Sequence, residues 1–268
     1  NQSKEASPPN YISFGSDSPT RIGDFGIETV NGMSWLVQAQ TTELAPQYKR
    51  GKEVVETEFV LQKLMPTEAL RIRGRHNVLN ALAALCLMQS VTHSMAPILY
   101  GLREYKGEPH RVEPITIIRE VEYFDDSKGT NVGATVAAIQ GLGPDRKLVV
   151  ILGGDGKGQD FSPLVEPITR FAKGIILIGR DAPVIEKVCA KAIEHHALER
   201  ICANSLESAV EQASQQAKAG DIVLLSPACA SFDMFKDYKH RARIFEQAVQ
   251  DLVHQASSTS HDSLRASV

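Results

Sequence analysis

Seven consecutive residues combine carboxylates, a cation and hydroxyls: Asp125-Asp126-Ser127-Lys128-Gly129-Thr130-Asn131. They follow a strand predicted at residues 123–125, and a helical pattern begins at Asn131. Asp126 or Thr130 can simply cap that helix. Lys128 is not needed for capping, and it would bring positive charge to a bound anion. This turn is therefore a candidate anion site.

A second turn, Gly153-Gly154-Asp155-Gly156-Lys157-Gly158, follows the strand predicted at residues 148–152. Its glycines allow a sharp turn and a close approach to a ligand, although glycines can also be ordinary turn residues. Lys157 offers a point charge to an anion. The turn is not an ATP phosphate loop, because Gly158 stands where that motif requires Ser or Thr.

The third turn is Ser226-Pro227-Ala228-Cys229-Ala230-Ser231-Phe232-Asp233, after a strand predicted at residues 222–225. Its small residues leave room, and Ser231 can donate to a carboxylate at a helix start. The alternative is that Ser231 or Asp233 is a helix cap. Taken singly, Ser127, Asp233 and most of the glycines are better explained as structural; taken together, the three polar turns favour a binding site.

The elements that must position these turns alternate between strand and helix from residue 123 onward. Strands are predicted at residues 123–125, 148–152, 175–178, 201–203 and 222–225, and helices begin at Asn131, Phe161, Ala182, Leu206 and Met234. Such alternation favours an α/β fold in which helices cover both faces of a Rossmann-like parallel sheet. Ligands bind beyond the carboxyl ends of the strands in such a sheet, so we expect the turns to share one crevice.

The earlier part of the chain has a different pattern. Strands are predicted at residues 12–15, 24–30, 33–40 and 54–61, with Asn31-Gly32 as a hairpin turn. Helices are predicted at residues 76–91 and from Pro97 to about Tyr105. We expect one domain portion at residues 1–107, a second domain at 108–254, and a Ser-rich disordered tail at 255–268.

The composition excludes several classes of protein. The 268 residues carry a formal net charge of -3, which gives no basic field for nucleic acid, and no run of about 18 apolar residues predicts membrane insertion. Four scattered cysteines predict reduced thiols in a cytoplasmic protein, and no metal-ligand set is expected within the chain. The start at Asn1, without a signal-peptide pattern, is interpreted as a cut or processed position.

The sequence resembles the Mur ligase family, and within it the ligases that add D-glutamate. The run Ser226 to Ser231 with Phe235-Lys236 is specific to those ligases, and Gly153 to Lys157 followed by Asp160-Phe161 strengthens the resemblance. The segments that carry the resemblance are Gly74 to Ala84, Pro109 to Glu113, Asp125 to Thr135, Leu152 to Pro163 and Leu224 to Lys236.

The resemblance implies the end of a central ATPase domain, to residue 107, followed by a Rossmann-like carboxy-terminal domain. The family's UDP-binding domain, phosphate loop, Mg²⁺ ligands and carbamylated lysine would belong to a preceding part. ATP would phosphorylate the carboxylate of UDP-N-acetylmuramoyl-L-alanine, and the amine of D-glutamate would attack the acyl phosphate. The protein would mainly position the reactants and stabilise negative charge.

Matching of motifs also implies roles for individual residues. Asn77 would meet adenine, Arg111 and Asp126 would hold the ribose and phosphates of ATP, and Lys128 would be catalytic by neutralising charge near the reacting centre. The residues lining the D-glutamate pocket would be Thr130, Lys157, Ser231, Phe232 and Tyr238. Two departures from the family pattern are Gly129, where Ala is common, and Tyr238, where Phe is frequent.

Two alternatives remain open on the sequence. The chain could be a non-catalytic Rossmann-like binding module, or part of a folylpolyglutamate-type ligase that shares the central and carboxy-terminal domains. The run Ser226 to Ser231 argues against the second alternative. A Gly-Lys-Ser/Thr loop in the residues that precede this chain would argue against the first.

Overall fold

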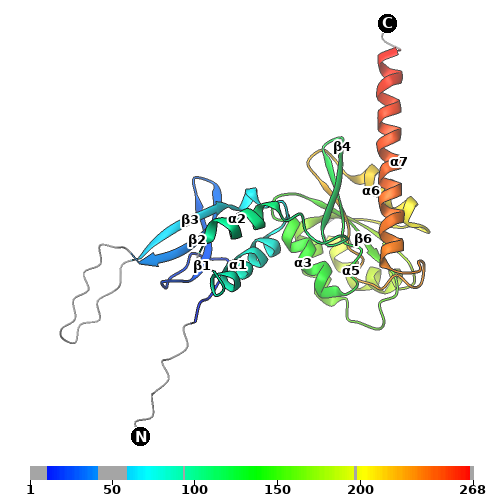
Figure 1. Ribbon diagram of the computed structural model, residues 1–268. Coiled ribbons are helices and arrows are strands. Elements are labelled where there is room, and N and C mark those ends of the chain that lie inside the picture. Colours follow the sequence, from blue (N-terminus) through cyan, green and yellow to red (C-terminus); the bar gives the residue numbers. More distant parts are fainter. Residues whose placement is uncertain (1–10, 42–58, 93, 196–197, 266–268) are drawn as a thin grey trace, which may run out of the picture. The chain divides into compact units, whose positions relative to one another are not determined.

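The computed structural model describes residues 11–41, 59–92, 94–195 and 198–265 (Figure 1). The chain divides into two compact units: residues 1–72 with 77–106, and residues 73–76 with 107–268. In the described part of the chain, no helix is both long enough and apolar enough to span a membrane.

The first unit contains a three-stranded antiparallel sheet formed by β1 (Phe25–Val30), β2 (Met33–Thr41) and β3 (Phe59–Pro66). Asn31 and Gly32 connect β1 to β2 with φ angles of 52° and 79°, the left-handed pair that a two-residue hairpin requires. The helices α1 (Arg75–Gln89) and α2 (Met95–Glu104) follow, after the short 3-10 helix η1 (Thr67–Ala69). Apolar residues of β1, β2, α1 and α2 share one core, including Phe25, Leu36, Leu82, Leu85 and Ile98.

Of the strands predicted in this unit, one is wrong and another lies partly outside the described residues. Residues 12–15 form only a single bridge, from Phe14 to Phe25, because bends begin at Ser16 and leave no length for a ladder. The strand predicted at 54–61 begins outside the described residues, and β3 continues to Pro66. Pro97 is the third residue of α2 rather than its first, a position within the first turn that proline tolerates.

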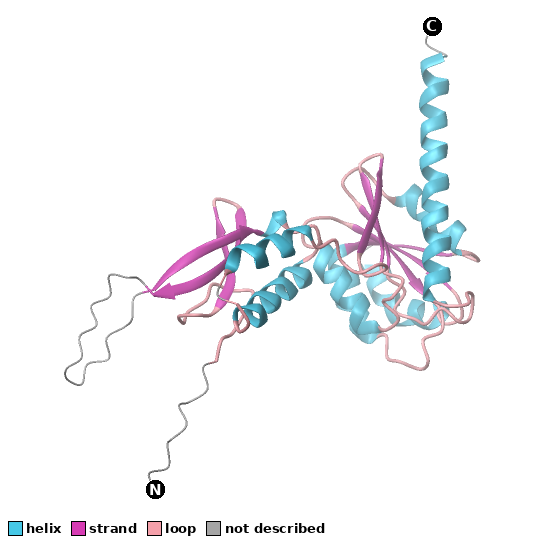
Figure 2. Ribbon diagram, in the orientation of Figure 1, coloured by secondary structure: helices cyan, strands magenta, loops and turns pink. Residues whose placement is uncertain are grey.

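The second unit is built on a six-stranded sheet with the order β4-β5-β9-β6-β7-β8. Strands are magenta in Figure 2. The strands are β4 (Glu113–Ile118), β5 (Val121–Asp125), β6 (Leu148–Gly153), β7 (Ala172–Ile178), β8 (Glu199–Cys202) and β9 (Ile222–Leu225). All neighbouring pairs from β5 to β8 are parallel, as predicted, whereas β4 pairs with β5 antiparallel. The sequence prediction missed β4, a half-exposed edge strand that contains Pro114.

Helices cover both faces of this sheet, which confirms the predicted α/β fold class. On β6, Leu148, Val150 and Leu152 join the core beneath one set of helices, while Val149 and Ile151 join the core on the opposite face. The first set consists of α3 (Val132–Leu142), η2 (Ser162–Leu164), α4 (Val165–Phe171) and α5 (Ala182–His195). The opposite face is covered by α6 (Leu206–Gln216) and α7 (Tyr238–Arg265).

The last helix differs from its prediction at both ends. α7 begins at Tyr238 rather than Met234, because the Asp237 carboxylate accepts a hydrogen bond from His240 N at 2.7 Å and caps the helix there. α7 then continues to Arg265, so the disordered tail expected from residue 255 is wrong for residues 255–265. Ser257 and Ser258 donate to the carbonyls of Val253 and His254, so these hydroxyls are compatible with helix. Residues 266–268 lie outside the described residues.

Candidate functional site

The three polar turns follow three neighbouring parallel strands, β5, β9 and β6. The turn after β9 therefore lies between the other two. Asp155 and Ala230 exchange two backbone hydrogen bonds of 2.9 Å, and Gly153 N donates to the Pro227 carbonyl at 2.8 Å. The turns containing Lys157 and Ser231 are thus joined directly through their backbones.

Two glycines lie at close backbone contacts of the second turn. A Cβ at Gly153 would lie 1.9 Å from the Ile178 carbonyl oxygen, and a Cβ at Gly154 would lie 2.4 Å from the Ala230 oxygen. Both residues also have φ angles, 121° and 130°, that only glycine adopts readily. Gly154 therefore permits the close approach of the second and third turns, and Gly153 permits the close approach of the second turn to the end of β7.

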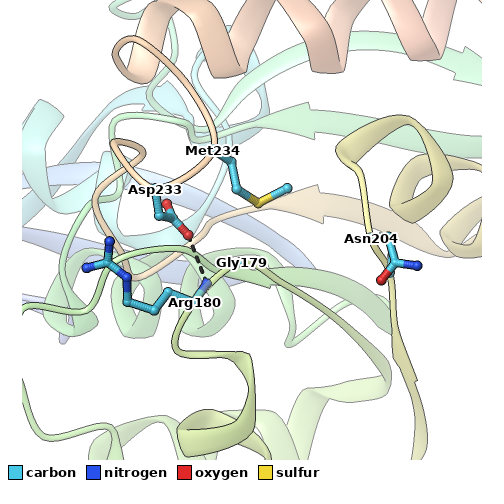
Figure 3. A pocket seen from close by; sticks show the side chains of 6 residues that line it. Gly179, Arg180, Asn204, Asp233 and Met234 are labelled. Carbon is cyan, nitrogen blue, oxygen red and sulfur yellow. Dashed lines mark hydrogen bonds between the residues drawn. The ribbon is translucent and has the colours of Figure 1, made fainter.

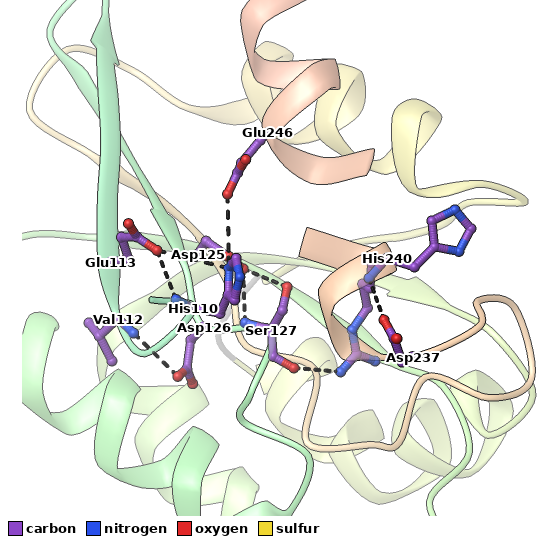
Figure 4. A network of polar contacts seen from close by, with 10 residues as sticks. His110, Val112, Glu113, Asp125, Asp126, Ser127, Asp237, His240 and Glu246 are labelled. Atoms are coloured by element: carbon purple, nitrogen blue, oxygen red, sulfur yellow. Dashed lines mark hydrogen bonds and ion pairs between the residues drawn. The ribbon is translucent and has the colours of Figure 1, made fainter. Parts of the chain in front are cut away.

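The buried Asp125 carboxylate organises the first turn (Figure 4). One oxygen accepts hydrogen bonds from Ser127 N at 2.8 Å and Ser127 Oγ at 2.5 Å. The other lies 2.8 Å from His110 Nδ1, while His110 O accepts from Lys128 N at 3.1 Å. Asp125 and Ser127 therefore fix the backbone that leads to Lys128, and the structural role expected for Ser127 agrees with these contacts.

Asp126 is buried and joins the first turn to two other segments. Its Oδ2 accepts from Ser226 Oγ at 2.6 Å, and its Oδ1 accepts from Val112 N at 3.3 Å. Burial raises the pKa of Asp126 to about 6, assisted by the nearby charge of Asp125. Arg111 lies between His110 and Val112, whose φ angles are 65° and 47°, and its side chain is exposed.

The Lys128 ammonium lies over the Tyr238 ring, 5.7 Å from the ring centroid. Lys128 is exposed at the first turn, while Tyr238 is the half-buried first residue of α7. Thr130 follows closely, since its backbone N–H donates to the Lys128 carbonyl at 2.9 Å. Lys128, predicted near the reacting centre, thus meets Tyr238, a residue predicted for the D-glutamate pocket, and Thr130 of that pocket follows Lys128 in the same turn.

Lys157 and Phe232 form a second pair of the same kind, with the ammonium 5.7 Å from the ring centroid. Phe232 is 67% exposed, whereas its neighbour Ser231 is 2% exposed. Lys157 has a φ of 52°, and its N–H donates to Asp155 Oδ1 at 3.1 Å. Among the described residues, neither Lys157 nor Lys128 has a carboxylate within ion-pair distance.

Asn77, the residue predicted to meet adenine, lies on α1 in the first unit. Its side-chain oxygen accepts from Asn80 Nδ2 at 3.2 Å. The other predicted site residues belong to the second unit, where Lys128 meets Tyr238 and Lys157 meets Phe232 at turns that follow strands of one sheet.

His110 also belongs to a group of potential metal ligands with Glu113, Asp125 and Glu246 (Figure 4), whose ligand atoms lie within 4.8 Å of one another. Burial raises the pKa of Glu246, and the charge of Asp125 acts in the same direction. Such a set has the imidazole and carboxylate ligands that can hold a cation.

An open hollow of about 390 Å³ lies beyond the carboxyl ends of β7 and β8 (Figure 3). Asp233, at the end of the third turn, borders it and accepts a hydrogen bond from Arg180 N at 2.8 Å. This contact agrees with the structural role expected for Asp233. The lining residues are Gly179, Arg180, Ala203, Asn204, Asp233 and Met234.

Sequence reasoning missed two side chains that connect the turns. Gln159 accepts from Val132 N at 3.0 Å and donates to the Ala228 carbonyl at 2.7 Å, which joins the start of α3 to the third turn. Arg241 is fully buried on α7 and donates to the carbonyls of Ser127 and Cys229. Arg241 could have been noticed as a cation on the apolar stripe of a helix.

Comparisons with known proteins agree with this architecture. Residues 110–229 match the family model of the Mur ligase glutamate ligase domain. The chain shares the fold of the UDP-N-acetylmuramate-alanine ligase MurC from Thermotoga maritima, with a TM-score of 0.56 and 17% identity over 89% of this chain and 47% of that chain.

Curated relatives match more closely in sequence. The chain is 57% identical to a UDP-N-acetylmuramoylalanine--D-glutamate ligase of Albidiferax ferrireducens, covering 92% of this chain and 48% of that protein. It is 52% identical to the protein of that name from Paraburkholderia phymatum, covering 93% of this chain and 49% of that protein. The chain thus spans about half the length of these relatives. With a glutamate ligase domain at residues 110–229 and relatives this similar along nearly its whole length, the chain belongs to the Mur ligase family.

Proposed function

We propose that this chain is a portion of an ATP-dependent ligase that adds D-glutamate to UDP-N-acetylmuramoyl-L-alanine through an acyl phosphate. The reaction is a cytoplasmic step of peptidoglycan synthesis, on which cell shape and division depend. The observation that carries the proposal is the pair of ammonium groups, on Lys128 and Lys157, that meet aromatic rings and no described carboxylate at one edge of the sheet. The shared name of the relatives supports this substrate assignment.

The amino-acid pocket lies at the second and third turns. D-glutamate carries two carboxylates, which Lys157 and Ser231 address from turns joined by the Asp155 and Ala230 backbones. Phe232 and Tyr238 supply the apolar walls, and Thr130 completes the pocket beside Lys128. A site with a few convergent polar groups and aromatic walls is typical for a small polar ligand.

The nucleotide and the reacting carboxylate lie on the side of the first turn. Arg111 has an exposed guanidinium suited to phosphate oxygens, and Asp126 accepts a hydrogen bond from the backbone N–H of Val112, the residue after Arg111. Asn77, in the first unit, is assigned to the adenine. Lys128 neutralises negative charge as the amine attacks the acyl phosphate. Mg²⁺ would offset phosphate charge when bound, and its ligands are assigned to the preceding part of the protein.

The domain assignment follows from the same proposal. Residues 1–107 are the carboxy-terminal part of the central ATPase domain, and residues 108–254 are the Rossmann-like carboxy-terminal domain. The division of the structure near residue 107 supports this boundary. The helical extension of α7 follows the second domain.

Substrate dependence in the full-length protein tests the function. Phosphate release from ATP with Mg²⁺ should require both UDP-N-acetylmuramoyl-L-alanine and D-glutamate, and the dipeptide product should accumulate in equal amount. L-glutamate and a reduced folate serve as control substrates. Activity with folate and L-glutamate would favour the folylpolyglutamate-type alternative, and binding without turnover would favour the non-catalytic module.

A further inference from the structure

Arg241 places a buried cation between two of the three turns. Its side chain is fully buried on α7, where Ala242 and Phe245 belong to the apolar core. Nη2 donates to the Ser127 carbonyl at 2.8 Å, and both Nη atoms lie 3.2 Å from the Cys229 carbonyl. One guanidinium therefore holds the turn after β5 and the turn after β9.

The two carbonyls are next to proposed binding residues. Ser127 immediately precedes Lys128, and Cys229 is two residues before Ser231. The first and third turns also meet where Ser226 Oγ donates to Asp126 Oδ2 at 2.6 Å. Arg241 adds a second connection, at Ser127 and Cys229, which are nearer to Lys128 and Ser231.

The chemistry of this position favours arginine for its geometry. A planar guanidinium can donate to two carbonyls at once, whereas a lysine ammonium on a flexible stem is a compact point charge. The buried Nε of Arg241 has no hydrogen-bond partner among the described residues, and burial lowers the pKa of Arg241 to about 10. Removal of the guanidinium would leave the carbonyls of Ser127 and Cys229, both fully buried residues, without this donor, so its loss acts directly on both turns.

We propose that Arg241 is a positioning residue that sets the separation of Lys128 from Ser231 and thereby the affinity for the amino-acid substrate. The inference rests on the proposed function. Arg241 does not touch substrate in this arrangement; it acts through the two carbonyls that it holds. Its removal should therefore impair the D-glutamate site more than the ATP site.

Steady-state kinetics of the full-length enzyme test this role, with Arg241→Met and Arg241→Lys compared with the parent. Arg241→Met should raise the Michaelis constant for D-glutamate by about tenfold or more, because charge-assisted hydrogen bonds to both turns are lost. The Michaelis constant for ATP should change less than about threefold, because Arg241 is expected to act mainly on the amino-acid site. Arg241→Lys can retain one carbonyl contact and should lie between the parent and Arg241→Met.

A matched control separates positioning from stability. Phe245→Leu alters a fully buried residue one turn further along α7, in the core rather than at the turns. It should lower the melting temperature and leave the D-glutamate constant at the parent value when assayed well below melting. An equal rise in that constant for Phe245→Leu would overturn the positioning role.

A double-mutant cycle provides the second measurement. Arg241→Lys combined with Ser231→Ala should raise the D-glutamate constant by less than the product of the two single effects, because both act on one site. Multiplicative effects would overturn the inference while leaving the function intact. So would a parent-like Michaelis constant for D-glutamate in both Arg241→Lys and a correctly folded Arg241→Met. A parent enzyme that does not use D-glutamate would overturn the proposed function as well.

Discussion

The two lysine–aromatic pairs each hold an ammonium group over a ring, where it can still bind an anion. An exposed cation–π contact contributes about 0.5–1 kcal/mol, whereas a hydrogen bond to a charged group contributes about 1.5–3 kcal/mol. The ring of Phe232 can therefore orient Lys157 without competing strongly with a carboxylate. The same comparison applies to Lys128 over Tyr238.

Replacing Lys157 with Met keeps an apolar stem against Phe232 and removes the charge. We expect the Michaelis constant for D-glutamate in the full-length enzyme to rise roughly 10- to 150-fold, because one charge-assisted hydrogen bond is lost. The constant for ATP should change little. The control is Lys187→Met, which removes a charge from the exposed side of α5. Parent-like kinetics for Lys157→Met would remove Lys157 from the amino-acid site.

Asp126 predicts a specific dependence of stability on pH. Because its folded pKa, about 6, is raised above the ordinary 3.8, its contribution to the unfolding free energy is full below pH 3.8 and is lost as pH rises through about 6. The loss is on the order of 2–3 kcal/mol. Asp126→Asn should therefore flatten the decline in unfolding free energy between about pH 4 and pH 7, measured by urea denaturation.

Asp160 gives a control of opposite sign. Hydrogen bonds from Ser162 Oγ and Ser162 N lower the pKa of this exposed carboxyl. Its contribution is present above the ordinary pKa and is lost as pH falls, so Asp160→Asn should alter only the acid limb. If the unfolding free energy of Asp126→Asn declines above pH 4 as steeply as that of the parent, ionisation of Asp126 does not destabilise the folded protein.

At the scale of elements, the site depends on the strand order rather than on any one loop. The order β5-β9-β6 places the last turn of the sequence between the first two. Gly154 permits close backbone contact between the second and third turns, and Arg241 of α7 and the Asp126–Ser226 hydrogen bond join the third turn to the first. A parallel sheet provides this convergence because the carboxyl ends of its strands lie at one edge.

At the scale of the molecule, the chain has part of the proposed ligase but no phosphate loop, since its sequence contains no G-x-x-x-x-G-K-[ST] motif. We expect the 268-residue polypeptide alone to form no dipeptide product from ATP, Mg²⁺, UDP-N-acetylmuramoyl-L-alanine and D-glutamate. Chromatographic detection of the product, with the full-length protein as positive control, checks this. Turnover by the isolated polypeptide at the full-length rate would contradict the assignment of ATP chemistry to a preceding part.

The amino-acid sequence by itself determined the α/β class, the hairpin at Asn31-Gly32, and the three turns that carry Lys128, Lys157 and Ser231. These features are local, because hydrophobic periodicity and turn chemistry operate over a few residues. The family resemblance was equally visible in short motifs. The individual site roles stay predictions, since they require bound substrates.

Only the tertiary structure decided which of these residues meet. The edge strand β4 pairs antiparallel although its half-exposed pattern is weak, and α7 starts where Asp237 caps it. The contact from Arg241 to Ser127 joins positions 114 residues apart. Lys157, in the turn after β6, meets Phe232, in the turn after β9. No local spacing encodes such partners, because they depend on the order in which the strands assemble and on which side chains the sheet then buries together.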